Sequence, residues 1–546
     1  FFSSRRRHTR FRNVTGVQTC ALPIFSPTLE AVHRLAAERH ISLDESPRLS
    51  SPLLFPEMDR AIERIRRALK DGEVIGVFGD YDADGITGTA QLVHMVRRHG
   101  GRVIPYLPDR LKEGYGMKQE SVDRLIDQGV NLIMTVDTGV TAHREIAAAK
   151  ARGVDTIVTD HHRPQGGRPD AYAVIHPELP HPFPNLHLSG SGVAFMLVRA
   201  LEGDAPWQGI DRDFTLAMIG TVGDLVPLLG ENRTLVEHGL RYAATTNDPA
   251  LRALIDGVVH QKPIKSDDIA FRVVPRINAA GRMAHPNIAL EALLNGGEAL
   301  QQLHLLNEER QMVVRQSVKD ARASLNPDDH FISLFSPAFS AGTVGLIAGS
   351  LTEETGKPSI VGAIDGDRIT ASLRSVAGID LMSYLTTPSV AELLTSFGGH
   401  AYAAGCSLKT ENATELRERL LTLIDERESA REFTPTLIAD AILSDGPISV
   451  QFVHELGCLA PFGAGNLEPR FVLPRKRVSH IRRVGAEGQH LQCRIDGLKG
   501  IGFNRGDIAD AINETTELDL LGTFSLSSWQ GQESIDFKII DVRRSL

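Results

Sequence analysis

Short apolar runs alternate with amphipathic stretches from residue 73 onward. Five runs predict β-strands, namely Val74–Phe78, Val103–Tyr106, Leu132–Val136, Thr156–Thr159 and Ala173–Ile175. The stretches between them predict helices, over 89–99, 121–127 and 142–151. Continuous apolar strands separated by helices indicate a parallel sheet covered on both faces. In such α/β sheets, ligands bind beyond the carboxyl ends of the strands.

A second α/β pattern follows a mostly helical stretch. That stretch closes with residues 298–325, which predict either a helix connecting two domains or a solvated helix packed along one lobe. The pattern then predicts a strand over 331–335, a helix over 342–355, a strand over 359–364 and a loop at Gly398-Gly399-His400.

Five short strands are predicted beyond the charged linker 425–432. They cover 478–484, 490–495, 500–503, 518–525 and 535–542. This number of strands is typical of an oligonucleotide-binding (OB) fold, a small β-barrel. The expected fold class is therefore α/β, with a parallel-sheet domain, a second α/β domain and a C-terminal OB-like barrel.

Composition narrows the class of protein only partly. The 546 residues exceed one hydrophobic core and predict two to four domains. No run reaches the roughly 20 apolar residues of a membrane span. The net charge of −9 does not exclude nucleic-acid binding, because a local basic groove can lie beside an acidic metal site. The chain has four widely spaced cysteines, which argue against a zinc ribbon and a disulfide framework and favour a cytoplasmic location: Cys20, Cys406, Cys458 and Cys493.

The first 25 residues have a separate character. They contain five Arg, no acid and no amphipathic period. A transit peptide or a secretory signal would account for parts of this composition. The segment instead resembles translated sequencing-adaptor read-through, so we expect it to be non-native. The predicted organisation is a non-native segment at 1–25, a catalytic α/β domain at 50–240, a helical region at 241–328, a second α/β domain at 329–428 and an OB-like domain at 434–546.

Acidic residues and histidines follow successive predicted strands. The run Gly79-Asp80-Tyr81-Asp82-Ala83-Asp84-Gly85 comes first, then Asp137, then Asp160-His161-His162, with Asp224 further on. Because the strands are parallel, we expect these residues to share one edge of the sheet. Carboxylates packed closely repel one another and need cations or protons. The cluster predicts two hard divalent metals held against a phosphate.

The three aspartates of the run 79–85 alternate along the chain. On extended backbone they would point the same way, and the flanking glycines permit a tight approach to a cation. The alternative is an Asp-rich turn or part of a calcium loop. An EF-hand loop needs Glu at its twelfth position, whereas the twelfth residue from Asp80 is Gln91, which disfavours calcium.

The position of His161 and His162 predicts that they are metal ligands rather than core residues, because both follow Asp160 and an apolar strand. Imidazole with carboxylates and without thiolate favours Mn²⁺ or Mg²⁺, with zinc as an alternative. Asp224 taken alone predicts a helix cap. Arg276, Arg374 and Arg282, which directly follows Gly281, could bind phosphate or form surface ion pairs.

In this order, the motifs resemble those of the DHH phosphoesterase superfamily. They are Asp-Tyr-Asp-Ala-Asp-Gly at 80–85, Val-Asp-Thr-Gly at 136–139, Asp-His-His at 160–162, Gly-Asp at 223–224, Gly-Arg-Met at 281–283 and Gly-Gly-His at 398–400. Within the superfamily, the chain is most similar to the RecJ family of bacterial single-strand-specific exonucleases, from about Leu53 to the carboxyl end. The segment 461–469 and the final barrel resemble the nucleic-acid-binding domain that shorter DHH proteins lack.

The resemblance implies a role for each matching residue. Asp82 would serve one metal, with Asp80 assisting; Asp84, His161 and Asp224 would serve the other; and Asp137 would bridge the two. His162 would touch the scissile phosphate. Further substrate phosphates would be bound by Asn278, Arg282, Ser372, Arg374 and His400. Thr138 departs mildly from the family, which often has Asn or Cys there, and puts no ligand in doubt.

The activity implied is two-metal hydrolysis of single-stranded DNA from the 5′ end to 5′-mononucleotides, in DNA repair and recombination. Water would be the nucleophile. The implied protein is a cytoplasmic monomer, with single-strand-binding protein and a RecQ-type helicase as candidate partners.

Two rival functions remain at this point. A nanoRNase, cyclic-dinucleotide phosphodiesterase or manganese pyrophosphatase of the DHH type would not need the extra barrel. A catalytically inactive DHH replication scaffold would have no reason to keep six costly metal ligands.

Overall fold

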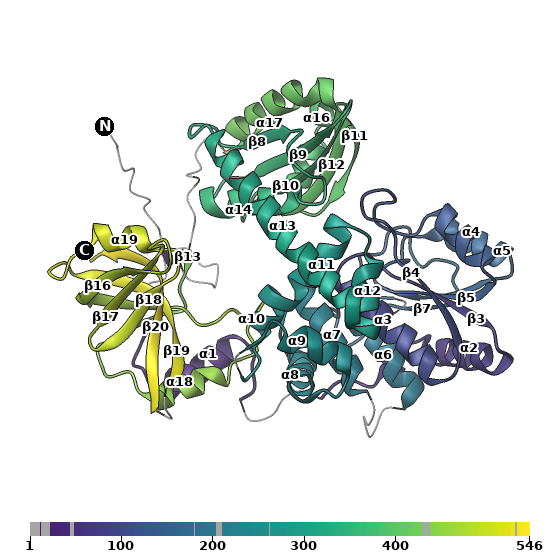
Figure 1. Cartoon of the computed structure of the whole chain (residues 1–546), viewed down its shortest axis with the longest axis horizontal. Coiled ribbons are helices and arrows are strands. Elements are labelled where there is room, and N and C mark those ends of the chain that lie inside the picture. Colours follow the sequence, from purple (N-terminus) through teal and green to yellow (C-terminus); the bar gives the residue numbers. More distant parts are fainter. Residues whose placement is uncertain are drawn as a thin grey trace. The chain divides into compact units, whose positions relative to one another are not determined.

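The computed structural model describes residues 11–12, 22–43, 48–179, 181–203, 210–260, 262–428, 433, 437–529 and 532–545. The chain forms two compact units (Figure 1). One comprises Phe1–Ser46, Thr434–Phe462 and Asn466–Leu546. The other comprises Pro47–Phe433 together with Gly463–Gly465. No helix in these described ranges is both long and apolar enough to cross a membrane.

The larger unit begins with the predicted parallel sheet. Its strand order is β4-β3-β5-β6-β7, and every neighbouring pair is parallel. The strands are β3 (Val74–Phe78), β4 (Arg102–Tyr106), β5 (Val130–Thr135), β6 (Asp155–Thr159) and β7 (Ala173–Ile175). All five predicted strands are confirmed, with ends that shift by at most two residues.

Helices cover both faces of this sheet. Alternate strand residues feed two separate cores, so each strand is apolar throughout. One core holds Ile75, Leu132 and Ile157, against α2 (Met58–Asp71), α3 (Ala83–Arg98) and α6 (Gly190–Glu202). The other holds Phe78, Ile133 and Val158, against α4 (Gln119–Asp127) and α5 (His143–Ala151).

A helical region extends the first core. It contains α7 (Asp211–Gly223), α8 (Gly230–Thr245), α9 (Pro249–Asp256), α10 (Ser266–Asp268), η2 (Ile269–Val273), α11 (Val274–Met283) and α12 (Asn287–Asn295). The predicted long helix is α13 (Gly297–Ala323), which packs against α11 and α12 through its first half and against α14 (Val344–Thr355) further on. It therefore connects the two α/β parts of this unit (Figure 1).

The second sheet has the order β11-β12-β10-β9-β8. Its strands are β8 (Ile332–Ser336), β9 (Ser359–Asp365), β10 (Arg368–Arg374), β11 (Leu394–Gly399) and β12 (Ala403–Lys409). The prediction of a Gly398-Gly399 loop is wrong, because both glycines end β11 and pair with Gly405 and Ala404. Only His400 lies in the turn.

The smaller unit contains an eight-stranded sheet. Its order is β16-β17-β18-β20-β19-β15-β14-β2, and within the described residues no ladder joins β16 to β2 to close a barrel. The strands are β2 (Ile24–Phe25), β14 (Ala441–Leu443), β15 (Phe471–Lys476), β16 (Val478–Val484), β17 (His490–Ile495), β18 (Leu498–Gly502), β19 (Leu518–Trp529) and β20 (Gln532–Arg544).

The segment predicted to be non-native is only partly described. Residues 1–10 and 13–21 lie outside the described residues. Ile24–Phe25 form β2, which pairs with β14, and the Phe25 side chain is buried. The next helix, α1 (Leu29–Glu38), packs against α18 (Val450–Gly457), so residues from 22 onward are part of this fold.

Candidate metal centre

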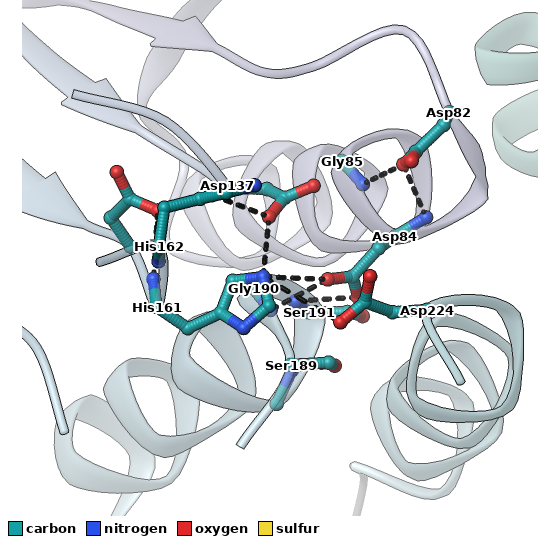
Figure 2. Close-up of polar contacts among 12 residues, drawn as sticks. Asp82, Asp84, Gly85, Asp137, His161, His162, Ser189, Gly190, Ser191 and Asp224 are labelled. Atoms are coloured by element: carbon teal, nitrogen blue, oxygen red, sulfur yellow. Dashed lines mark hydrogen bonds and ion pairs between the residues drawn. The ribbon is translucent and has the colours of Figure 1, made fainter. Parts of the chain in front are cut away.

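Loops at the carboxyl edge of the parallel sheet bring the predicted ligands together. Asp80 and Asp137 lie two residues beyond β3 and β5, and Asp160 directly follows β6. Asp224 follows the last residue of α7, whose end packs beside the start of α3. Strand order thus gathers residues that are more than 140 positions apart in the chain (Figure 2).

The start of α3 fixes the first three aspartates. Asp82 is the N-cap, and its Oδ1 accepts hydrogen bonds from the backbone N–H of Asp84 at 3.0 Å and of Gly85 at 3.2 Å. A Cβ at Gly85 would lie 2.6 Å from the backbone nitrogen of Asp80, so only glycine fits. The prediction that all three aspartates point the same way is wrong, because helical backbone from Ala83 turns Asp84 toward a different group.

Three groups of potential metal ligands result. They are Asp80, Asp82 and Asp137; Asp84, His161 and Asp224; and Asp137, His161 and His162, each with ligand atoms within 4.8 Å of one another. Asp137 belongs to two of these groups. The His161 Nε2 atom lies 3.1 Å from Asp137 Oδ1 and 3.6 Å from Asp224 Oδ2 (Figure 2). The arrangement is that of two adjoining cation sites with one carboxylate between them.

The protonation chemistry of the cluster fits a metal. Burial, followed by the charge of Asp82, raises the pKa of Asp84 to about 7. Burial and then Asp84 raise the pKa of Asp224 to about 8. The pKa values of Asp80 and Asp137 are raised by the same two causes, burial and neighbouring carboxylates. Divalent cations relieve this repulsion when they bind.

Three atoms of the cluster are buried without a hydrogen-bond partner among the described residues. They are Asp80 Oδ1, Asp137 Oδ1 and His161 Nε2. Buried polar atoms are rarely left unpaired without a reason such as an ion. Burial, with a smaller contribution from His162, lowers the pKa of His161 to about 4, so its Nε2 is available as a neutral ligand. Carboxylate oxygens with one or two imidazoles suit Mn²⁺ or Mg²⁺.

Asp160 belongs to none of the three ligand groups. Its carboxylate accepts hydrogen bonds from the backbone N–H of His161 at 2.7 Å, of His162 at 3.1 Å and of Val140 at 2.9 Å. Its Oδ1 also lies 2.9 Å from His162 Nδ1. Burial alone would lower the pKa of His162, but this contact with Asp160 outweighs it and raises the pKa to about 9. Asp160 therefore orients both histidines.

Residues that the sequence analysis did not select complete the centre. Gly190 and Ser191, at the start of α6, donate backbone N–H groups to the Asp84 carboxylate at 2.6 and 2.9 Å. Tyr115 places its hydroxyl 3.0 Å from His162 Nδ1 and 3.2 Å from the Asp137 carbonyl oxygen. Ser189 is the N-cap of α6, and a serine before an apolar run is a sequence signal for the start of a helix. No local sequence pattern distinguishes Tyr115.

Several arginines that form no ion pair within the described part of the chain lie beside the acidic cluster. Burial, and then the charges of Arg110, Arg310 and Arg374, lower the pKa of Arg282 to about 9. Arg282 donates to the Gly342 carbonyl at 3.2 Å, just before α14. Arg110, which the sequence analysis missed, stacks over the Tyr81 ring at 4.9 Å. Gathered cations of this kind form an anion site.

The remaining residues predicted to bind substrate do not all lie at one site. Ser372 and Arg374 lie on β10 beside the first turn of α14, where a Cβ at Gly345 would be 3.1 Å from Arg374 Nη2. His400 is exposed in the β11–β12 turn. Asn278 accepts a hydrogen bond from the Ala83 N–H at 2.8 Å, so its oxygen anchors the start of α3.

Three family descriptions match the chain. They are the DHH family, N-terminal domain, at residues 74–221; the DHHA1 domain at 328–426; and the RecJ OB domain at 439–541. The parallel sheet and its carboxylate edge fall in the first, the second sheet in the next and the eight-stranded sheet in the last. Fold and site therefore define a DHH-type phosphoesterase with an added OB domain.

Known relatives narrow the class further. The chain is 31% identical to the single-stranded-DNA-specific exonuclease RecJ of Salmonella typhimurium, over 98% of this chain and 99% of that protein. It is 33% identical to RecJ of Bacillus subtilis, over 90% of this chain, and spans 64% of that longer protein. The chain belongs to the RecJ family of single-stranded-DNA-specific exonucleases.

Solved structures agree with this assignment. The crystal structure of Thermus thermophilus RecJ in complex with Mn²⁺ matches with a TM-score of 0.81 and 31% identity, over 96% of this chain and 79% of that one. RecJ of the same organism in complex with Mg²⁺ matches with a TM-score of 0.77 and 28% identity, over 96% and 78%. These are the two metals that the donor set of this chain favours.

Proposed function

We propose that this chain is a metal-dependent exonuclease that hydrolyses single-stranded DNA from its 5′ end to 5′-mononucleotides, in DNA repair and recombination. The observation that carries the proposal is the gathering of three adjoining ligand groups, two of which share Asp137 and two of which share His161. These groups contain buried atoms without a hydrogen-bond partner among the described residues, and carboxyl groups with raised pKa values. Both features destabilise the sheet edge if it serves only the fold. Membership of the RecJ family supports the choice of substrate.

The ligand roles follow from the three groups. Asp82 and Asp80 would hold one ion, and Asp84, His161 and Asp224 would hold the other. Asp137 would serve between them, because it groups with Asp80 and Asp82 and its Oδ1 lies 3.1 Å from His161 Nε2. Two bound Mn²⁺ or Mg²⁺ ions would supply Lewis acidity and a water of lowered pKa. Asp160 holds the ring of His162 and the backbone N–H of His161, and the protonated His162 would donate to the scissile phosphate.

The arginine group holds the substrate for that reaction. Arg282, Arg374 and the missed Arg110 neutralise phosphate oxygens beside the metals, with Ser372 and His400 as further donors. Asn278 acts indirectly, through the start of α3. The pKa of Arg282 is lowered by burial and by the other arginines, so an anion among them removes a repulsion.

The proposed substrate and partners rest on the same family membership. The substrate is one strand of DNA, and single-strand-binding protein and a RecQ-type helicase are the partners we expect. The described cysteines Cys406, Cys458 and Cys493 form no disulfide with one another, which fits a cytoplasmic location. The protein would act as a monomer.

End-labelled DNA tests the proposed function. A single strand labelled at either its 5′ or its 3′ end is incubated with Mn²⁺, and early products are separated by size. We expect the 5′ label to appear first as mononucleotide, and Asp137→Asn to abolish its release. Asp170→Asn is the matched control, because Asp170 is an exposed partner of Lys150 in the same domain.

Two outcomes would reject the proposal. Cleavage restricted to dinucleotides would indicate a small-substrate phosphodiesterase. Tight binding of the strand without hydrolysis would indicate a replication scaffold.

A further inference from the structure

Two further arginines without an ion-pair partner in the described residues lie farther from the metal centre than Arg282. Arg310 on α13 and Arg276 on α11 continue the group outward from Arg282, along the seam where these two helices pack. Within the described residues, neither has a carboxylate oxygen within 4 Å of its guanidinium group, although α13 itself carries several acidic residues. We call Arg276, Arg310 and Arg282 the arginine row.

Contacts within the seam hold the arginine row in place. Arg276 reaches across from α11, and its Nε lies 3.1 Å from Nδ1 of His304 on α13. Arg310 donates through Nη2 to Asn307 Oδ1, one turn earlier on α13, at 3.0 Å. The Nε atom of Arg310 is buried without any hydrogen-bond partner among the described residues. The side chains are therefore ordered by neutral groups, and among the described residues no carboxylate pairs with them directly.

The charges of the row act on one another. Burial and then Arg276 lower the pKa of Arg310, while Arg310 is among the causes that lower the pKa of Arg282. The pKa of Arg276 is lowered by burial, despite an opposing effect of Glu308. Partly buried cations that repel one another destabilise a fold unless anions compensate them.

We propose that the arginine row binds phosphates of the substrate strand beyond the scissile one, so that the strand follows the α11–α13 seam away from the metal centre. The proposal rests on the function proposed above and adds the course of the strand. A phosphodiester backbone is the occupant that the charges select, because it presents one anion per nucleotide in sequence. A dinucleotide without a 3′-phosphate has no phosphate on the 3′ side of the scissile one, so it offers the outer arginines nothing to bind.

Strand length provides the test. In Arg310→Gln and Arg276→Gln, we expect KM for a strand of about 16 nucleotides to rise about tenfold for each variant, with kcat unchanged. Hydrolysis of a dinucleotide should match the wild type. The dependence of strand binding on salt should become shallower, by about 0.7 in the log–log slope for each charge removed.

Two further variants separate binding from folding. Arg310→Lys retains the charge and should keep most of the affinity for the long strand. Arg322→Gln is the matched control on the same helix, because Arg322 is exposed and paired with Glu354 at 2.8 Å. It should leave both substrates unaffected.

The other outcomes overturn the inference. Equal losses on both substrates would mean that Arg310 and Arg276 support the metal centre or the fold. Unchanged KM and salt slope would mean that the strand takes another course. Absence of hydrolysis by the wild type would instead reject the proposed function.

Discussion

Asp137 occupies a costly backbone conformation at the point where the two ligand groups meet. Its φ angle is 59°, in the left-handed region that non-glycine residues rarely adopt. The surrounding structure enforces it, because the Asp137 N–H donates to the Thr159 carbonyl at 3.0 Å and the Thr138 carbonyl accepts from Thr135 Oγ1 at 2.7 Å. Strain of this kind persists where the geometry of a functional group depends on it.

Asp160 gives a prediction about orientation. Asp160→Asn removes the charge that raises the pKa of His162 and weakens the hold on both histidines. We expect kcat/KM to fall by about 10- to 100-fold. Because His162 would then lose its proton at lower pH, the alkaline side of the pH profile should shift to lower pH. A profile unchanged in position would contradict the role of Asp160, and Asp170→Asn serves again as the control.

Among the elements, close packing of three helices fixes the ligand group of Asp84, His161 and Asp224. α7 approaches α6 and α3 at Gly220, where a Cβ would lie 2.4 Å from Ser191 Cβ and 2.6 Å from Asp84 Oδ1. Ser191 in turn donates its N–H to Asp84. The position of Asp84 thus depends on the absence of a single methyl group on a neighbouring helix.

Gly220→Ala tests this packing. The added methyl group should cost about 1–3 kcal/mol of unfolding free energy, measured by urea denaturation, and should weaken Mg²⁺ binding measured by calorimetry. The matched control is Gly349→Ala in α14, where a Cβ would meet nothing within 4 Å. The control should gain about 0.5–1 kcal/mol from helix propensity, with unchanged Mg²⁺ affinity. Normal Mg²⁺ binding by Gly220→Ala would contradict the account.

Elements were predictable where the signal is local. Apolar strands followed by Asp marked the sheet edge at Asp80, Asp137 and Asp160, whereas Asp224 follows a helix and taken alone predicted only a helix cap. The start of α3 was missed, because Asp- and Gly-rich sequence has poor helix propensity and the Asp82 cap outweighs it. β10 also escaped prediction, although Ile369, Ala371 and Leu373 alternate as a half-buried strand requires.

Residues defined by tertiary contacts were not predictable. Arg110 and Tyr115 lie in an irregular loop, and their importance comes from Tyr81, His162 and Asp137, which are remote or unmarked in the sequence. No local pattern encodes such neighbours. The lack of a carboxylate beside Arg310, within the described residues, likewise depends on which side chains pack beside α13.

Charge of both signs is concentrated in the larger unit. In the proposed function its acidic edge would bind cations and its arginines would bind anions, so the net charge of −9 is the sum of two local charges of opposite sign. Without metal, the carboxylates of the edge repel one another. The stability of the whole molecule should therefore depend on both pH and metal.

A thermal unfolding series tests this dependence. Asp84 and Asp224 have folded-state pKa values of about 7 and 8, above the ordinary value, and His162 has one of about 9. The metal-free folded state therefore holds more protons than the unfolded state between about pH 6.5 and 9. Its Tm should fall as pH rises through this range, and Mg²⁺ should remove most of the fall. A metal-free Tm that is flat or rises would contradict the account.

The central claim is that the cluster holds two ions that share Asp137. Equilibrium dialysis against Mn²⁺, followed by elemental analysis, measures the number of ions per chain directly. We predict two ions for the wild type and one for the double variant that carries both Asp84→Asn and Asp224→Asn. The control Asp170→Asn should bind two. A wild-type chain that binds a single ion at saturation would contradict the two-metal centre.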